Sequence, residues 1–566
     1  MGGMASTEAA ADLVALLADE GVSHLFINPG TDTAPVQEAL AAARAAGAPH
    51  PETVLCLHEH VALSAAIGHH MASGLPQAVM VHVDAGTLNL GGAIHNAQRN
   101  RSPVVVMAGR APYTVAEEVR GHRDSPIHWQ QEQVDQPGVM RAFGKWHMEV
   151  PRGRELAPIV RRAFQVAQAP PSGPAYVMLP REALMEPGPG SLPARLRPPA
   201  PPGPDPAALA QVAEALASAE RPVLVTARTG AHAENVPVLA RIAELLGAPV
   251  IDQRDRANLP GGHPLHAVSG ERWLRAADTV LLLDVEVPWV PALAAPPPDA
   301  RVLQIDVDCA KPSMPLWTFP VEVAVTADTR AALPALERAL LGLATPLRCD
   351  QWAERRRAVE AELATARAGA RDRATSAEPA DAPDAMLAAL DGALPDDAIV
   401  LEEVVTSRAA LHRQLHRAPG RYFQAGSPAL GWAIGGAIGI KLARREAPVV
   451  AVCGDGAFNF GVPTAALWAA HRAGAPFVAV VLNNRSYYAS KRPVQSLYPE
   501  GAAVAANDFP ETELTPETDY ALLARACGGE GRRVDAPADL PDALRWAVTE
   551  SSHGRCVVID ARLPRP

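Results

Sequence analysis

The sequence predicts an α/β protein built from three doubly wound parallel sheets. Short apolar runs, each about the length of a strand, alternate with amphipathic segments along the 566-residue chain. Strands that read as continuous apolar runs are typical of parallel sheets covered by helices on both faces. The alternation occurs in three blocks, so we expect three domains, each with its own sheet.

The first block extends over residues 1–185 and ends at a segment, 186–206, so rich in proline and glycine that we expect a linker. The strands expected in this block are residues 23–27, 53–57, 78–83, 104–107 and 175–179.

The second block, residues 207–345, repeats the alternation and leads through a charged helical and polar segment, 346–384, to the third block, 385–566. The strands expected in these two blocks are residues 222–226, 248–251, 279–284, 301–306, 398–401, 448–453 and 477–482.

The composition argues against several classes of protein. A formal net charge of −11 opposes a nucleic-acid surface. No apolar run approaches the ~20 residues that cross a membrane, and the N-terminus does not resemble a secretory signal. The six cysteines show no metal-type spacing. We therefore expect a cytoplasmic protein with reduced thiols.

Two strand ends of the third block carry polar residues suited to a metal and a diphosphate. Gly454-Asp455-Gly456 ends the run 448–453, and Asn483-Asn484 ends the run 477–482. Carboxylate and amide oxygens are hard ligands that suit Mg²⁺. The glycines let backbone N–H groups approach phosphate oxygens, and a helix beginning near Gly461 would add its positive end.

This spacing resembles the signature of thiamine diphosphate (ThDP) enzymes, which bind the cofactor diphosphate through a Gly-Asp-Gly to Asn-Asn motif. The resemblance implies that the side chains of Asp455 and Asn484 and the carbonyl of Ser486 bind Mg²⁺. The diphosphate contacts that it implies come from Gly454, Gly456, Ala457, Thr406 and Ser407.

The resemblance also implies a glutamate in the first domain that protonates the aminopyrimidine ring of the cofactor. Glu59 follows an apolar run and opens a helical stretch, so it matches this glutamate by context. A solvated capping residue is the alternative. Leu430 takes the place of the apolar wedge under the cofactor, and the Pro428 carbonyl would accept from the 4′-amino group. Ordinary core packing is the alternative for Leu430.

Two segments of the first domain resemble the substrate side of benzoylformate decarboxylase. Asn28-Pro29-Gly30-Thr31 follows the first strand, and His82 ends the third. The resemblance places Asn28, Pro29 and Gly30 at the cofactor, and Thr31 and His82 beside the substrate. A neutral imidazole there would protonate the reacting carbon after CO₂ departs. A structural histidine is the alternative.

Two departures from that decarboxylase leave the reaction open. Its second catalytic histidine has no counterpart in residues 284–291, and Gln131 resembles the glutamine of acetohydroxyacid synthases, which points to carboligation. Those synthases bind FAD in the middle domain, and coenzyme A-dependent relatives bind ADP there. The run 222–226 is not followed by GxGxxG, which argues against a nucleotide in this chain.

Across its full length the chain resembles the 2-oxo acid decarboxylase and acetohydroxyacid synthase group. The function implied is ThDP- and Mg²⁺-dependent cleavage of a 2-oxo acid, with decarboxylation favoured over acetolactate-type ligation. A 2-hydroxyacyl-coenzyme A lyase and a noncatalytic ThDP-fold subunit are the alternatives. Family members bind the cofactor between two subunits, so the resemblance implies at least a homodimer, commonly doubled to a homotetramer. We expect a small-molecule substrate and no nucleic-acid or membrane partner.

Overall fold

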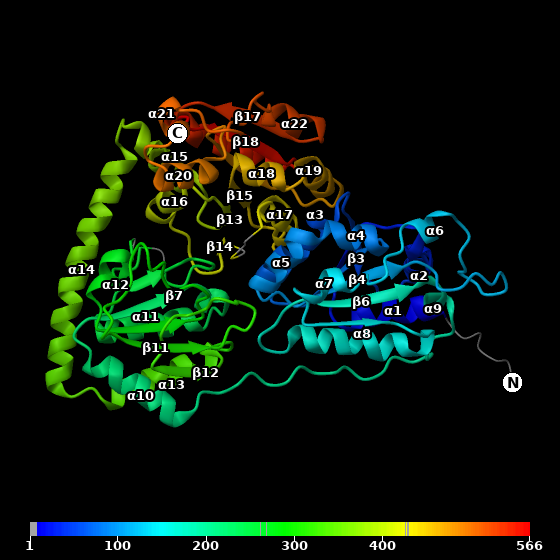
Figure 1. The fold of residues 1–566 in the computed structure, drawn as a ribbon, viewed down its shortest axis with the longest axis horizontal. Helices are drawn as coiled ribbons and strands as arrows, with labels where there is room; N and C mark the ends of the chain where they lie inside the picture. Colours follow the sequence, from blue (N-terminus) through cyan, green and yellow to red (C-terminus); the bar gives the residue numbers. More distant parts are fainter. Residues whose placement is uncertain (1–7, 261, 268, 425, 427–428) are drawn as a thin grey trace.

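The computed structural model of the chain describes residues 8–260, 262–267, 269–424, 426 and 429–566. Its strands form three six-stranded sheets in which every pairing is parallel, which confirms the predicted fold class. Figure 1 shows the first sheet on the right, the second at the lower left and the third at the top. Within the described parts of the chain, no helix is both long and apolar enough to cross a membrane.

The first sheet has the strand order β2-β1-β3-β4-β6-β5. Its strands are β1 (His24–Ile27), β2 (Glu52–Leu55), β3 (Gln77–Val81), β4 (Val104–Arg110), β5 (Trp146–Glu149) and β6 (Ala175–Pro180). The helical segments are α1 (Ala9–Asp19), η1 (Thr31–Thr33), α2 (Ala34–Ala46), α3 (Glu59–Ser73), α4 (Val83–Asn89), α5 (Gly91–Arg99), α6 (Ile127–Gln130), α7 (Gly138–Arg141), α8 (Gly153–Gln168) and α9 (Arg181–Met185).

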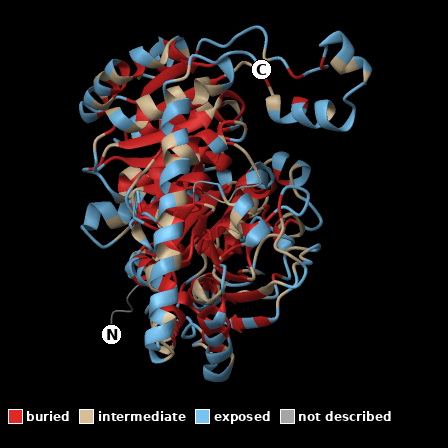
Figure 2. Cartoon of the chain, turned by 90° about the vertical axis from the view of Figure 1, so that its left-hand side faces the viewer, coloured by how far each residue is buried: buried red, intermediate tan, exposed pale blue. Residues whose placement is uncertain are grey.

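The second sheet has the order β12-β11-β10-β7-β8-β9. Its strands are β7 (Pro222–Thr226), β8 (Val250–Asp252), β9 (His266–Ala267), β10 (Thr279–Leu283), β11 (Arg301–Asp306) and β12 (Val323–Thr326). The helical segments are α10 (Pro206–Ser218), η2 (Thr229–Ala231), α11 (Asn235–Leu246), α12 (Glu271–Ala276) and α13 (Thr329–Gly342). The long helix α14 (Pro346–Ala374) then leads to the third sheet, and Figure 2 shows much of its outward surface exposed.

The third sheet has the order β14-β13-β15-β16-β18-β17. Its strands are β13 (Ile399–Glu403), β14 (Tyr422–Phe423), β15 (Val449–Gly454), β16 (Val478–Asn483), β17 (Glu530–Val534) and β18 (Val557–Arg562). The helical segments are η3 (Pro379–Asp381), α15 (Ala382–Ala393), α16 (Arg408–Gln414), α17 (Trp432–Ala443), α18 (Asp455–Phe460), α19 (Pro463–Arg472), α20 (Tyr488–Leu497), α21 (Ala502–Ala506), α22 (Tyr520–Ala526), η4 (Pro537–Asp539) and α23 (Leu540–Ser552).

The apolar runs identify the strands at the centre of each sheet but miss most of those at the edges. β9 and β14 have only two residues each, and β5 alternates apolar and polar residues and is partly exposed. An edge strand pairs on one side only, so a short or polar segment suffices. The run 78–83 also ends earlier than expected, because Val83 begins α4 and leaves His82 as its N-cap.

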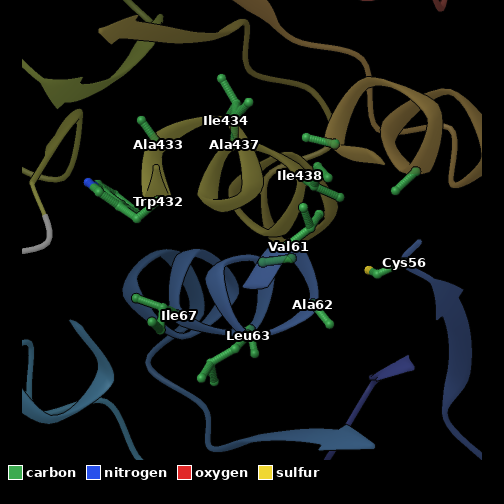
Figure 3. Packing of buried hydrophobic residues seen from close by; sticks show 14 of the residues in the cluster. Cys56, Val61, Ala62, Leu63, Ile67, Trp432, Ala433, Ile434, Ala437 and Ile438 are labelled. Atoms are coloured by element: carbon green, nitrogen blue, oxygen red, sulfur yellow. The ribbon is translucent and has the colours of Figure 1, made fainter. Parts of the chain in front are cut away.

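Helices α3 and α17 join the first and third sheets through one shared apolar core. Figure 3 shows their side chains meeting, with Val61 and Ile438 among them. A Cβ on Gly68 would lie 2.1 Å from the Gly436 carbonyl oxygen, and one on Gly439 would lie 1.8 Å from that of Ala65. Glycine is therefore required at Gly68 and Gly439 for the helices to approach this closely.

Candidate active site

Glu59 is the first residue of α3 and is buried, with 5% of its surface exposed. Its Oε1 accepts a hydrogen bond of 2.9 Å from Asn28 Nδ2, and its Oε2 one of 3.0 Å from Asn89 Nδ2. The carboxylate is thus held by two amides that follow β1 and end α4. Sequence reasoning named Asn28 but missed Asn89, which is the last residue of the helix that His82 caps.

The segment before α17 lies against the first sheet's helices in the same chain. Asn96 on α5 donates from Nδ2 to the Ala429 carbonyl at 2.9 Å, and its Oδ1 accepts from the Ala429 N–H at 3.2 Å. His60 Nε2 lies 3.0 Å from the Gly431 carbonyl oxygen. Leu430 packs partly buried against the shared core. The predicted carbonyl acceptor, Pro428, lies outside the described residues.

Glu403, the last residue of β13, caps α17 from inside the protein. Its carboxylate accepts from the backbone N–H groups of Gly431, Trp432 and Ala433 at 2.8, 3.2 and 3.1 Å. Burial raises the pKa of Glu403 to about 8, and the three N–H donors oppose that rise. Sequence reasoning missed this residue, although two acidic residues at the end of an apolar strand were a visible signal.

The structure brings Asp455 and Asn484 together at the carboxyl edge of the third sheet. Asp455 begins α18, directly after β15, and Asn484 directly follows the neighbouring strand β16. The Asp455 carboxylate accepts from Gly456 N at 2.8 Å and from Arg485 N at 2.7 Å. Burial raises the pKa of Asp455. The helix expected near Gly461 is α19, which begins at Pro463, and a shorter helix, α18, precedes it and begins at Asp455 itself.

These residues fit a hard cation shared with a diphosphate. Among the residues that the structure describes, no group of three or more His, Cys, Asp or Glu side chains is placed to hold a metal. The predicted metal site offers instead the Asp455 carboxylate, the Asn484 amide oxygen and the Ser486 carbonyl. This set leaves coordination positions for phosphate oxygens. A Cβ on Gly454 would meet no atom within 4 Å, so space remains beside it.

The other predicted diphosphate contacts occupy the same edge of the sheet. Thr406 and Ser407 follow β13, which pairs with β15, and Ser407 is the N-cap of α16. Gly456 and Ala457 are buried in α18.

The structure brings together His82 and Gln131, both of which were predicted to lie beside the substrate. His82 Nε2 lies 3.2 Å from Gln131 Oε1, and His82 Nδ1 is hydrogen-bonded to Asp32 Oδ1. The hydrogen bond to Asp32 raises the pKa of His82, although burial opposes it. This pairing favours the protonated ring over the neutral imidazole that the resemblance implies. Thr31 is exposed on η1, half-buried Gly30 precedes it, and Pro29 is exposed.

A cavity of about 530 Å³ lies between the second and third sheets and reaches Gly426, close to the segment before α17. Residues 286–290, where no histidine stands, line it from the middle of the chain. Arg408 and His412 on α16 line it from the other side.

Comparison with known families identifies three matching models. Residues 7–139 match the N-terminal TPP (thiamine pyrophosphate) binding domain of thiamine pyrophosphate enzymes, residues 209–336 their central domain and residues 404–561 their C-terminal TPP binding domain. Together they cover most of the chain.

Individual relatives match along nearly the whole chain. A benzoylformate decarboxylase from Pseudomonas aeruginosa is 27% identical over 94% of this chain and 95% of its own length. A probable acetolactate synthase from Mycobacterium bovis is 29% identical over 87% of this chain and 85% of its own. The structure of a putative thiamin diphosphate-dependent enzyme isolated from Mycobacterium smegmatis superposes with a TM-score of 0.76 at 25% identity, covering 99% of this chain and 100% of that one.

Proposed function

Because the chain belongs to the thiamine pyrophosphate enzymes, in the group of 2-oxo acid decarboxylases and acetolactate synthases, we propose that it uses ThDP and Mg²⁺ to release CO₂ from a 2-oxo acid. The observation that carries this proposal is the burial of Glu59 at the start of α3, held by two amides and next to the segment that precedes α17.

Bound ThDP would supply a carbanion that attacks the substrate carbonyl and a positive ring that accepts the electron pair released on bond cleavage. Glu59 would hold a proton at the pyrimidine ring, and Leu430 would support the cofactor from below. Asp455, Asn484 and the Ser486 carbonyl would hold Mg²⁺. His82 and Gln131 would face the substrate, where His82 supplies a proton.

We also propose that the three blocks 1–185, 207–345 and 385–566 are separate domains and that two chains assemble. The 20 residues between α9 and α10 span up to about 65 Å when extended. The N-terminal domain of a second copy can therefore make the same contacts with α17 that the structure contains within one chain.

Co-expression of differently tagged Glu59→Gln and Asp455→Asn chains tests this assembly. If sites form between chains, each mixed dimer regains one intact site and activity returns. If sites form within a chain, the mixed dimers stay inactive, and an active site shared between two chains is excluded.

A second candidate is transfer of the acyl fragment to another carbonyl, as in acetolactate synthesis. The contact between Gln131 and His82 favours it, because an amide there can orient a second carbonyl instead of leaving the site to a proton donor. A panel of 2-oxo acids with aldehyde and acyloin products both quantified distinguishes the two reactions.

The substitution Glu59→Gln tests the proposal directly. We expect CO₂ release to fall by at least about 10²-fold, in the range that a positioned acid–base group contributes. Glu182→Gln is the matched control, because Glu182 is also a buried glutamate of the first block and accepts from the Thr114 N–H. An unchanged rate in the Glu59 variant would refute its role.

A further inference from the structure

Asp32 and His82 form a hydrogen-bonded pair among the helices that pack on the first sheet. Asp32 lies on η1 with 4% of its surface exposed, and its Oδ1 is hydrogen-bonded to Nδ1 of His82, the N-cap of α4. The second ring nitrogen, Nε2, lies 3.2 Å from Gln131 Oε1. Side chains from two other segments are therefore aligned on one imidazole.

Two glycines make room for the pair. A Cβ on Gly30 would lie 2.0 Å from His82 Nδ1, and a Cβ on Gly109 would lie 1.6 Å from Asp32 Oδ2. Real Cβ atoms do not approach other atoms this closely, so any side chain at either position would displace the pair. The positions of His82 and Asp32 are thus fixed by the backbone on both sides.

The hydrogen-bond partners determine where the imidazole carries hydrogen. Asp32 Oδ1 is a carboxylate oxygen, and Gln131 presents its Oε1 to the ring. An imidazole that donates to both of these oxygens carries hydrogen on both nitrogens, which is its charged form. The other oxygen of Asp32, Oδ2, is buried and accepts no hydrogen bond among the described residues, so His82 is the partner that compensates this carboxylate.

We propose that Asp32 is a positioning residue that holds His82 as an imidazolium with its Nε2 hydrogen on the Gln131 side, ready for transfer to the substrate. The inference rests on the proposed decarboxylation, in which the reacting carbon needs a proton. The bond to CO₂ breaks, its electron pair stays on the remaining fragment, and the Nε2 hydrogen forms the new C–H bond. Neutral His82 then regains a proton from solvent.

Other charged groups around His82 act on it less strongly than Asp32. Glu59 favours the protonated ring, and His128 opposes it. Helix α4 packs against α3, β4 and α7, and Gln131 follows α6. The titratable groups on these elements are Glu59, His60, His69 and His70 on α3, Arg110 on β4, Arg141 on α7, Asp84 on α4 and His128 on α6.

The test is the substitution Asp32→Asn, which keeps the shape of the side chain and removes its charge. The His82 ring is followed by NMR in the full-length, histidine-labelled protein, with its signal assigned by its loss in His82→Gln. We expect the titration midpoint of His82 to fall in Asp32→Asn. Asp12→Asn is the matched control, because Asp12 is also a buried aspartate of the first block but lies on α1.

The kinetic readout is the pH profile of CO₂ release. We expect kcat at pH 7 to fall by about 10²-fold, the smaller contribution of a positioned proton donor, with KM changed much less. The basic limb of the profile should move to lower pH in Asp32→Asn and stay in place in Asp12→Asn. Asp32→Ser serves the same purpose if the asparagine variant does not fold.

The outcomes separate this inference from the proposed function. An unchanged His82 midpoint in both Asp32 variants overturns the positioning role, whatever the substrate is. A lowered midpoint in a protein that releases CO₂ from no 2-oxo acid supports the pair and overturns the proposed function. A lower kcat with an unmoved pH limb also overturns the inference, since it shows a structural role alone.

Discussion

The two halves of the candidate site are held together in different ways. In the C-terminal half, the Asp455 carboxylate accepts hydrogen bonds from the backbone N–H groups of Gly456 and Arg485. In the N-terminal half, side chains hold Glu59, and the residues that supply them are 31 and 30 positions away. A backbone-held group depends on two neighbouring strand ends, whereas a side-chain-held group depends on several elements docking correctly.

The largest effect is expected at the backbone-held carboxylate. Asp455→Asn keeps both the fold of the turn and the shape of the side chain but removes the charge that would face Mg²⁺ in the proposed site. Since loss of an outer-sphere partner alone costs up to about 100-fold in metal affinity, we expect the apparent affinity for ThDP with Mg²⁺ to fall by at least that much. Titration of ThDP into the variant and the parent measures it.

Removal of the metal provides the control for this prediction. Treatment with EDTA should inactivate the parent, and added Mg²⁺ should restore its activity. Asp455→Asn should stay weak at any Mg²⁺ concentration that saturates the parent. Equal ThDP affinity in the two proteins would show that Asp455 does not bind the metal.

A smaller effect on activity is expected when one of the two amides that donate to Glu59 is removed. Asn89→Ala leaves Oε2 of a buried carboxylate without its donor, at a cost of about 1–3 kcal/mol. We therefore expect kcat to fall by roughly 5- to 150-fold, measured as CO₂ release at saturating ThDP. Asn89→Asp should be worse, because it places a second carboxylate beside Glu59. Parent-like rates in both variants would mean that Glu59 does not depend on this contact.

The same contrast explains what the sequence could predict. Asp455 and Asn484 stand at the ends of two apolar strands in a fixed local spacing, so the pattern alone placed them together. Glu59 was found through the resemblance to ThDP enzymes, which calls for a glutamate after a strand and before a helix of the first domain. Asp32 and Asn89 were missed because only the docking of η1 and α4 shows that they hold His82 and Glu59.

The fold was predictable to a similar extent. Buried central strands are visible in the sequence as apolar runs, and the three blocks of such runs predicted three sheets. Edge strands such as β9 and β14 are two residues long and become strands only because a neighbour pairs with them. The close approach of α3 and α17 likewise depends on Gly68 and Gly439, whose partners are far away in the sequence.

A moderate effect on stability is expected at the cap of α17. Glu403→Ala leaves three N–H groups at the start of this helix without their acceptor, and loss of an N-cap costs about 1–2 kcal/mol. Thermal unfolding measures the change. Asp205→Ala is the control, because it removes the side-chain cap of α10, where Asp205 accepts from the Ala208 N–H. Both variants should lose stability, but only Glu403→Ala should also weaken ThDP binding, because α17 follows the Leu430 segment. Equal ThDP binding in both variants would show that the cap of α17 does not contribute to cofactor binding.

The smallest effect is the pH dependence that the Asp32–His82 pair gives to stability. The folded protein raises the pKa of His82 through its hydrogen bond to Asp32. The pair therefore stabilises the fold fully below the ordinary histidine pKa of about 6.5, and this contribution is lost as the pH rises through the folded value.

The measurement is the thermal unfolding midpoint of the parent minus that of Asp32→Asn, between pH 6 and pH 9. This difference should be largest at pH 6 and should shrink toward pH 9, by an amount equivalent to on the order of 1 kcal/mol. For Asp12→Asn, which removes a buried aspartate without a histidine partner, the difference should stay constant over the same range. A constant difference for Asp32→Asn would mean that His82 is neutral throughout this pH range. Hydrogen bonds between side chains would then hold the N-terminal half of the candidate site without a charged Asp32–His82 pair.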